Sequence, residues 1–296
     1  MNQPLFGKQV TRIEFWRELC PHLTIEGSRD FPQAIFPSVK SLVERICVEG
    51  YVNEPGVLPL NAIEALRVGI KRLQENGIPP AFGFVYDEFW QIFRGLAPFL
   101  IGALGPEYRL LPSFWAWYVE PTDAAAGWTP HRDRPAATIA ADNMPDSLTI
   151  WLPLTHAAPL NGCLYVLPMQ WDDNFHRRNT SKCADMVLEG AQLQNIRALP
   201  ASPGSLLAWN QTLFHWGGRA SRMGTEPRCS ISLEFQRGDR APLTTPLIHP
   251  TKIPPFYSRL GLVGRKLRKY APFHGFNTPE MQLLAAGLEW KYGFKS

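Results

Sequence analysis

Four residues in the second half of the chain have side chains suited to binding a metal ion and an organic anion. His131 and Asp133 lie two residues apart, His215 follows His131 by 84 residues, and Arg228 follows His215 by 13. On a strand, residues two apart point the same way, so the pair can share one ion and the third ligand must come from another strand. Two imidazoles and one carboxylate with open positions are typical of non-haem Fe(II) oxygenases. The planar cation of Arg228 can bind a carboxylate through two hydrogen bonds, which predicts a co-substrate such as 2-oxoglutarate.

A lone His-Arg-Asp is also common in salt-bridged surface turns. The neighbouring sequence is therefore needed to decide between a metal site and such a turn. His215 follows a strand that begins at Pro203-Gly204 and precedes two glycines. Arg228 begins a strand on which Ser230 lies on the same face. These features favour a metal site over a surface turn.

The elements that must position these residues change character near residue 110. Before it, apolar residues at three and four spacing predict helices over 38–48 and 60–73, with a short strand or turn at 50–52. A long apolar helix is expected over 86–104, ending at Gly105. After it come short strands, at 111–120, 148–154, 163–167, 205–209 and 228–235. Asn161-Gly162 predicts a hairpin between the second and third of these strands.

Alternation within the strands separates two faces. In 228–235, Arg228, Ser230, Ser232 and Glu234 share one face, and four apolar residues share the other. In 148–154, Thr149 and Trp151 lie opposite the aliphatic residues. Strands with one polar face around a cavity and one apolar face against helices fit a jelly-roll barrel with an internal site. We therefore expect a mainly β fold with flanking helices and a jelly-roll, cupin-like core.

The 296 residues suit a single domain. We divide it into a mostly helical part at 1–109, the jelly-roll core at 110–240 and a C-terminal part at 241–296. The C-terminal part is Pro-rich and predicts an extended wrap, followed by a helix that begins at Thr278-Pro279. Residues 171–200 are polar and aperiodic, so we expect a lid over the metal, with Trp171, Arg177 and Arg178 as substrate contacts.

The sequence resembles the phytanoyl-CoA dioxygenase-like (PhyH) family of Fe(II)- and 2-oxoglutarate-dependent oxygenases over roughly residues 110–236. The resemblance rests on the order of its motifs rather than on any one of them. They are Pro130-His131-Arg132-Asp133, the segment 148–154 leading to Asn161-Gly162 and 163–168, Pro203-Gly204 with 205–209, Phe214-His215, and Arg228 before an apolar strand. The segment after Pro168 departs from the family pattern, because Met169-Gln170-Trp171 stands where Gly-Ser-His is usual.

The resemblance implies a double-stranded β-helix with His131, Asp133 and His215 on iron and Arg228 on the distal carboxylate of 2-oxoglutarate. It also implies consumption of O2, release of succinate and CO2, and hydroxylation of an unactivated C–H bond in a natural-product or lipid-like molecule. Asp133 favours hydroxylation over halogenation, which needs a small residue there. The gap between His215 and Arg228 is about two residues longer than usual, so Arg219 and Arg222 compete for the carboxylate. We favour Arg228 because Ser230 can add a hydrogen bond.

Composition excludes several other classes of protein. The chain is 45% hydrophobic and 19% charged, as is ordinary for a globular protein. It has no apolar run of 18 residues and no signal-peptide pattern at its start, so we expect a cytoplasmic protein without a membrane span. The five cysteines include no CxxC pair, which indicates neither a disulfide framework nor a thiolate zinc site.

Further residues are candidates for contact with substrate or co-substrate. Trp151 can line the co-substrate pocket or fill the core. Trp117, in the aromatic segment 114–118, can face the substrate or pack internally. Arg132 and Arg134 can attract an anionic substrate or serve as surface charges. The interval 252–279 carries six basic residues and no acid, namely Lys252, Arg259, Arg265, Lys266, Arg268 and Lys269. It is either a solvated surface or a contact for anionic surfaces.

Two other functions use the same residues. A jelly-roll protein that binds a small ligand without catalysis would not need an intact metal triad. A zinc hydrolase would need a general base near the metal, and the sequence identifies none. We expect a small-molecule substrate and no nucleic-acid partner, because no nucleic-acid-binding module is recognised.

Overall fold

The fold combines helices with antiparallel sheets. The computed structural model describes residues 7–27, 33–122, 128–134, 144–175, 190–270 and 275–293. Within these ranges more residues lie in helices than in strands, so the expectation of a mainly β fold was too narrow. No described helix has the length and hydrophobicity needed to cross a membrane.

The described strands form two antiparallel sheets. The larger has the order β1-β6-β3-β8-β2, and the smaller has the order β5-β4-β7. The larger sheet comprises β1 (Tyr51–Glu54), β6 (Leu206–Asn210), β3 (Ser147–Pro153), β8 (Arg228–Gln236) and β2 (Arg109–Val119). The smaller comprises β5 (Arg197–Leu199), β4 (Leu164–Leu167) and β7 (Phe214–Gly217). Each predicted strand is present, and β5 and β7 are additions.

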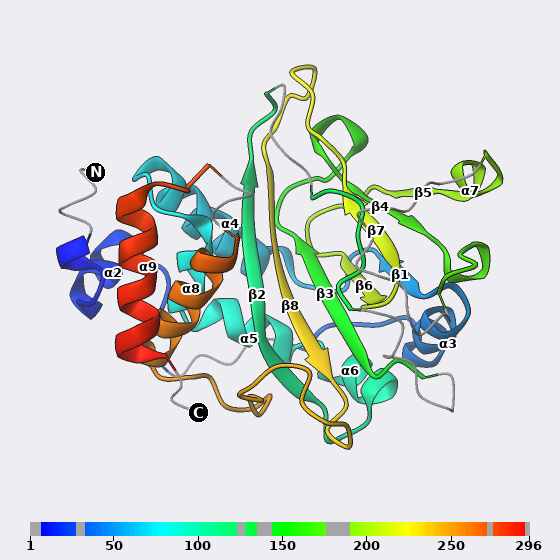
Figure 1. Cartoon of the computed structure of the whole chain (residues 1–296), viewed down its shortest axis with the longest axis horizontal. Helices are drawn as coiled ribbons and strands as arrows, with labels where there is room; N and C mark the ends of the chain where they lie inside the picture. The colour runs from blue at the N-terminus through cyan, green and yellow to red at the C-terminus, as the bar shows by residue number, and fades with distance from the viewer. Residues whose placement is uncertain are drawn as a thin grey trace.

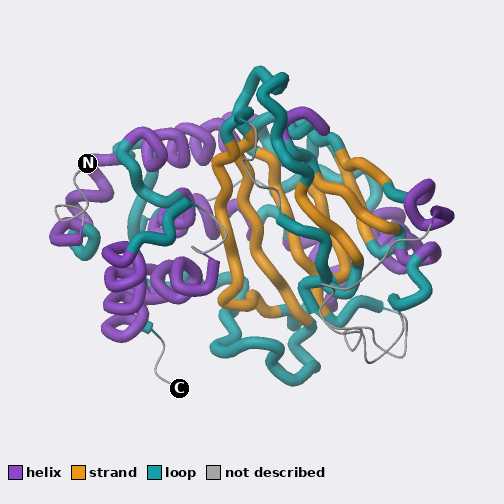
Figure 2. The backbone as a smooth tube through the Cα atoms, turned by 45° about the horizontal axis from the view of Figure 1, so that its top comes forward, coloured by secondary structure: helices purple, strands orange, loops and turns teal. Residues whose placement is uncertain are grey.

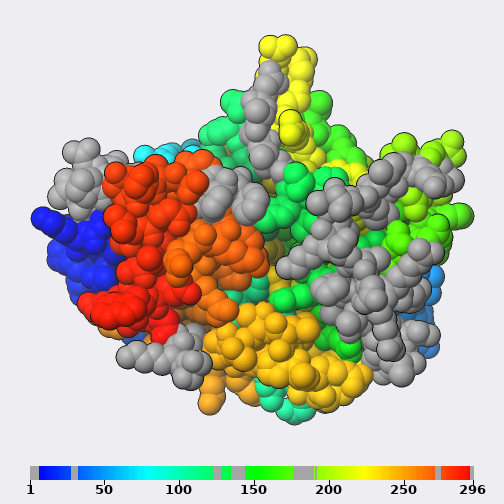
Figure 3. Space-filling view, in the orientation of Figure 1, coloured from blue at the N-terminus to red at the C-terminus, as the bar shows by residue number. Residues whose placement is uncertain are grey.

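Most helices gather on one side of the larger sheet (Figures 1 and 2). They are α2 (Ile13–Leu19), α4 (Leu60–Glu75), α5 (Glu88–Arg94), α8 (Phe256–Tyr270) and α9 (Pro279–Tyr292), with the 3-10 turn η1 (Pro80–Val85). The other helical elements are α3 (Val39–Glu49), α6 (Ala97–Leu104), α7 (Gly190–Asn195), η2 (Pro159–Asn161) and η3 (Met169–Trp171). In the space-filling view, α9 lies beside the N-terminal segment and α8 lies beside α9 (Figure 3).

Two apolar clusters, one on each face of the larger sheet, join three layers of secondary structure. Ile150 and Ile231, from one face of the larger sheet, belong to a cluster with the buried residues of the helices. Trp151 and Trp209, from the opposite face, belong to a second cluster with Val166 of the smaller sheet. The order of layers is therefore helices, larger sheet, smaller sheet. The alternation predicted for 148–154 and 228–235 is confirmed.

The helices predicted from the sequence begin and end near the expected residues, except within 86–104. The side chain of Ser38 caps α3 and that of Thr278 caps α9, each accepting a hydrogen bond from a backbone N–H three residues on. The single helix expected over 86–104 is instead two, α5 and α6. Pro98 explains the break, because a proline inside a continuous helix clashes with the carbonyl four residues earlier, that of Arg94.

The hairpin predicted at Asn161-Gly162 was wrong. β3 and β4 belong to different sheets, so the turn carries the chain from the larger sheet to the smaller one. Gly162 has φ of 86°, and a Cβ there would lie 2.6 Å from the carbonyl oxygen of Gly218. A glycine is therefore required by both conformation and close approach.

The C-terminal part is more ordered and more buried than expected. Residues 256–270, read from the sequence as part of a Pro-rich wrap, form α8. Two of its basic residues are internal: Arg259 pairs with Asp87 at 2.6 Å, and Lys266 is 4% exposed. The interval is therefore not a uniform solvated basic surface. Arg268 and Lys269 of α8 remain exposed.

The segment 171–200 is only partly a loop. Its described residues include α7 and β5, and β5 pairs with β4 within the smaller sheet. Phe175 is fully buried in the second apolar cluster. Arg177 and Arg178, two of the three expected substrate contacts, lie outside the described residues. The description of this segment as an aperiodic lid was too broad, because its described ends belong to the fold.

Candidate metal centre and adjoining cavity

The segment that carries His131 lies against β7, which brings the two histidines together. The backbone N–H of His131 donates to the carbonyl of His215 at 2.9 Å, and the reverse hydrogen bond measures 3.0 Å. Gly217 N–H also donates to the carbonyl of Trp128 at 3.1 Å. Directly opposed residues of an antiparallel pair project to the same face. The two imidazole centroids are accordingly 4.4 Å apart.

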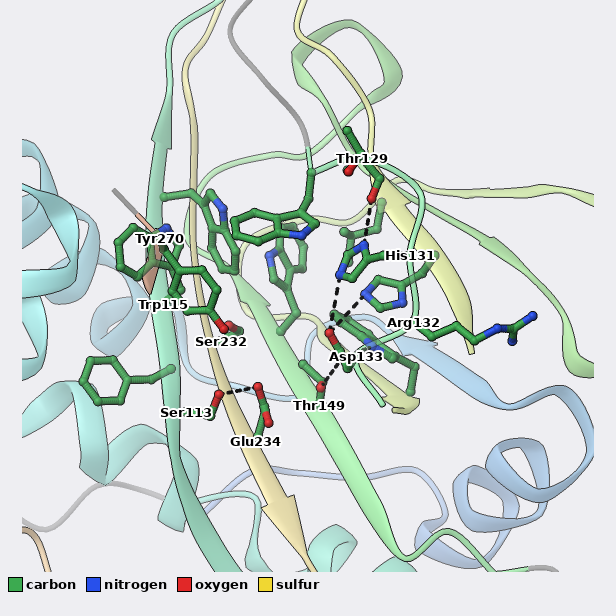
Figure 4. A pocket seen from close by; sticks show the side chains of 18 of the residues that line it. Ser113, Trp115, Thr129, His131, Arg132, Asp133, Thr149, Ser232, Glu234 and Tyr270 are labelled. Carbon is green, nitrogen blue, oxygen red and sulfur yellow. Dashed lines mark hydrogen bonds and ion pairs between the residues drawn. The ribbon is translucent and has the colours of Figure 1, made fainter. Parts of the chain in front are cut away.

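Asp133 completes a cluster of three potential metal ligands. Its Oδ1 lies 3.4 Å from Nε2 of His131 and 3.8 Å from Nε2 of His215. One ligand atom from each residue lies within 4.8 Å of the other two. Figure 4 shows His131 and Asp133 turned toward each other at the cavity wall. The structure thus brings together the three residues chosen from the sequence.

Hydrogen bonds orient each ligand. Nδ1 of His131 is 2.7 Å from the carbonyl of Thr129, and Nδ1 of His215 is 2.9 Å from that of Leu213. A carbonyl only accepts, so each Nδ1 carries the hydrogen, and in the neutral ring Nε2 keeps its lone pair for an ion. This is the usual arrangement of second hydrogen bonds around metal-binding histidines.

The second carboxylate oxygen of Asp133 is held by the larger sheet. Thr149 Oγ1 donates to Oδ2 at 2.7 Å, and Trp209 Nε1 donates to the same oxygen at 3.0 Å. Gln211 Nε2 in turn donates to Thr149 Oγ1 at 3.1 Å. With Oδ2 occupied, Oδ1 is the oxygen left to face the histidines. The sequence placed Thr149 on the right face but gave no sign of Trp209 or Gln211.

The protonation states also suit metal binding. Burial alone would raise the pKa of Asp133, but the neighbouring His215 and His131 outweigh it and hold that pKa well below its usual range. Burial lowers the pKa of His215 to about 4. At neutral pH the site therefore offers a carboxylate and a neutral imidazole, the forms that bind a metal.

Arg132 is held by contacts outside the metal ligands. Its guanidinium is buried, donates to Asp172 Oδ1 at 2.8 Å and donates to the carbonyl of Thr212 at 2.6 Å. In Figure 4 its side chain points away from His131 and Asp133. The ion pair with Asp172 and the hydrogen bond to Thr212 anchor the His-Arg-Asp segment, and Arg132 also lines the cavity.

Arg228 is a buried cation that faces the same cavity. It is 3% exposed, its Nη1 donates to Ser230 Oγ at 2.7 Å, and its guanidinium carbon lies 5.7 Å from the ring centre of Trp151. Its Nε has no hydrogen-bond partner, and no acidic side chain of the described ranges forms an ion pair with it. Burial lowers the pKa of Arg228 to about 10. An organic anion would satisfy this group.

The two competing arginines do not reach the site. Arg219 and Arg222 are both exposed, and neither lines the cavity that contains the three ligands and Arg228. Burial thus distinguishes Arg228 from them.

The cavity has a volume of about 460 Å³, within the range of small-molecule sites. Trp151, Trp117 and Arg134 line it, as the sequence suggested. Trp171 does not line it and is 47% exposed, so the structure does not bring that candidate to the site. Other lining residues were not singled out from the sequence: Trp115, Trp128, Trp209, Glu234, Lys269 and Tyr270. Glu234 was placed from the sequence on the polar, cavity-facing side of its strand together with Arg228, but not as a substrate contact.

Comparison with known proteins supports the predicted resemblance. The family model described as Phytanoyl-CoA dioxygenase (PhyH) matches residues 100–224. This interval contains the three clustered ligands and ends before Arg228. No curated protein sequence matches the chain. The resemblance to PhyH-like, Fe(II)- and 2-oxoglutarate-dependent oxygenases is confirmed.

Several solved structures share the fold at low sequence identity. The apo form of ThoJ, described as a non-heme monooxygenase, has a TM-score of 0.54 and 12% identity, covering 84% of this chain and 99% of its own. EvdMO1 has a TM-score of 0.52 and 20% identity, covering 67% and 50%. SnoK, described as a non-heme alpha ketoglutarate dependent carbocyclase from nogalamycin biosynthesis, has a TM-score of 0.50 and 16% identity, covering 70% and 87%.

Proposed function

We propose that this protein is an Fe(II)- and 2-oxoglutarate-dependent dioxygenase that hydroxylates an unactivated C–H bond of a small organic molecule. One observation carries the proposal. Three convergent metal ligands and a buried arginine without an acidic partner among the described residues open into one cavity. The two antiparallel sheets around it are interpreted as the jelly-roll core.

The ligand set fits iron. His131 Nε2, His215 Nε2 and Asp133 Oδ1 would hold the ion on one face and leave other positions open. Thr149 and Trp209 keep the second oxygen of Asp133 occupied and so orient the carboxylate. Asp133 itself favours hydroxylation, because halogenation would need its position on the metal for a halide.

The surroundings of Arg228 fit the distal carboxylate of 2-oxoglutarate. Ser230 fixes the guanidinium through Nη1, and Trp151 packs near its carbon. The lack of an acidic partner among the described residues leaves its charge available in a site where it is 3% exposed, and charge-assisted hydrogen bonds are the strong ones. When bound, iron and the keto acid would supply oxidation by O2, with release of succinate and CO2.

The comparisons support an oxidative reaction without fixing its outcome. The matching family is described as a dioxygenase, one structural neighbour is described as a monooxygenase and another as a carbocyclase. We propose hydroxylation as the simplest outcome for this ligand set. The zinc hydrolase and the non-catalytic binding protein are the alternatives, and neither requires both the three metal ligands and Arg228.

The test is metal-dependent consumption of 2-oxoglutarate. Anaerobic addition of Fe(II) and 2-oxoglutarate should give the visible charge-transfer absorption of an iron–keto acid chelate, and O2 should then yield succinate. His215→Ala should lose both signals. His249→Ala, at an exposed histidine outside the cavity, is the matched control and should keep them. Hydrolytic activity with Zn(II) and no response to 2-oxoglutarate would contradict the proposal.

A further inference from the structure

The cavity continues past the metal ligands, along the strand face that carries Arg228. Glu234 lies on this face six residues from Arg228, a distance of roughly 20 Å along an extended strand. In the pairing of β3 with β8, Glu234 is directly opposite Thr149, the residue that orients Asp133. Glu234 is therefore placed beside the metal ligands and far from the arginine proposed to bind the co-substrate.

The carboxylate of Glu234 is fixed in position but retains hydrogen-bonding capacity. Its Oε1 accepts from Ser113 Oγ, and its Oε2 accepts from Arg134 Nη2 at 3.2 Å. Behind it, Lys266 Nζ donates to Ser113 Oγ at 2.9 Å. A carboxylate has about four acceptor positions, and the described residues occupy two of them. Figure 4 shows Glu234 and Ser113 below the aromatic residues of the cavity.

Aromatic rings connect this carboxylate region to the metal site. Tyr270 packs edge-on against Trp115 and against Trp128, with ring centres 5.2 Å apart in both pairs. The ring of Trp128 lies 5.9 Å from that of His131. All four residues line the cavity. Such walls favour a flat, ring-bearing molecule, because aromatic faces bury much apolar area at well-defined geometry.

The other charges near Glu234 decide which donor it can accept. Arg134 and Lys269 line the same cavity, and Lys266 lies behind Ser113. The cavity lining carries four cations, Arg132, Arg134, Arg228 and Lys269, against the two carboxylates of Asp133 and Glu234, so a cationic ammonium group would be repelled. A neutral hydroxyl group can donate to the carboxylate without that repulsion.

We propose that Glu234 determines substrate specificity by accepting a hydrogen bond from a neutral hydroxyl group of a ring-bearing substrate that lies against the Trp115–Tyr270–Trp128 wall. The inference rests on the proposed function for its place in catalysis, but binding alone tests it. It assigns the end of the cavity near Glu234 to the organic substrate and the end near Arg228 to the co-substrate.

Three probes of nearly equal shape separate the possible donors. They are 2-naphthylmethanol, 2-ethylnaphthalene and 2-naphthylmethylamine, which end in a hydroxyl, a methyl and an ammonium group. Equilibrium dialysis against the full chain, with and without Fe(II) and 2-oxoglutarate under nitrogen, gives the three affinities. The readout is the ratio of hydroxyl to methyl affinity in each variant, because a ratio cancels the shared contribution of the rings.

Glu234→Gln should lower this ratio about fivefold, because an uncharged acceptor forms a weaker hydrogen bond than a carboxylate. Glu234→Met, which accepts no such bond, should lower it further. Thr244→Val is the matched control, because it removes the hydrogen bond that Arg134 Nη2 donates to Thr244 and leaves the carboxylate in place. It should keep the wild-type ratio.

An unchanged ratio in Glu234→Gln and Glu234→Met, in protein that melts like the wild type, would overturn the inference. Tightest binding of the ammonium probe by the wild type would also overturn it. Absence of iron and 2-oxoglutarate binding would instead count against the proposed function. The two failures are therefore distinguishable within one set of samples.

Discussion

Replacing Arg228 should have opposite effects on co-substrate binding and on the stability of the co-substrate-free protein. The cation is 3% exposed and has no acidic partner among the described residues. Burial lowers its pKa from 12.5 to about 10, and at 1.36 kcal/mol per pKa unit this disfavours the folded cation by about 3 kcal/mol. Arg228→Met keeps much of the side-chain volume and removes that penalty. The free variant should therefore be at least as stable as the wild type.

Binding of 2-oxoglutarate should be weakened strongly by the same substitution. Truncating one partner of a buried, hydrogen-bonded charge pair costs about 2–5 kcal/mol, or roughly 30-fold to several thousand-fold in Kd. Calorimetric titration of 2-oxoglutarate into the anaerobic Fe(II) protein measures the loss, and urea unfolding without co-substrate measures stability. Arg219→Met and Arg222→Met are matched controls at exposed positions and should bind normally.

Either of two results would refute this reasoning. If all three arginine variants lost similar affinity, Arg228 would not be the specific carboxylate ligand. If Arg228→Met were strongly destabilised without co-substrate and bound 2-oxoglutarate normally, the arginine would be a structural residue.

Three further substitutions test residues that hold the site in place through hydrogen bonds or ion pairs. Thr149→Val removes a hydrogen bond to Asp133 and should weaken metal affinity about 10–100-fold, as measured by competition with a chelator. Asp172→Asn leaves Arg132 buried without its counter-charge and should cost about 3–5 kcal/mol in urea unfolding, whereas an unchanged midpoint would contradict the anchoring role. Burial lowers the pKa of Lys266 from 10.5 to about 7. Between pH 7 and 10.5 the unfolded state thus binds more protons than the folded state, so wild-type stability should rise with pH there, and Lys266→Met should abolish that rise.

The site residues that lie on or near strands could be predicted from the sequence, because the patterns that identify them involve residues close together in the chain. Alternation in 228–235 separates Arg228 and Glu234 from the apolar face that packs on the helices. The two-residue spacing of His131 and Asp133 likewise indicates one shared ion. Both arguments need only the period of an extended chain.

What could not be predicted depends on contacts between distant residues. Lys266 donates to Ser113 across 153 positions, and the ion pair of Arg259 with Asp87 joins α8 to the N-terminal helices. A basic, Pro-preceded segment gives no local sign that these charges are internal, so α8 and the cavity residue Tyr270 were missed. The hairpin predicted at Asn161-Gly162 failed for a related reason. A tight turn does not show whether the following strand stays in the same sheet.

The most direct test of the central claim is a crystal structure obtained anaerobically with Fe(II) and 2-oxoglutarate, with anomalous data at the iron edge. We expect one iron peak bound by His131, Asp133 and His215 at about 2.0–2.2 Å, and a keto acid whose distal carboxylate is bound by Arg228. Iron elsewhere, or a co-substrate carboxylate held by Arg219 or Arg222, would contradict the account.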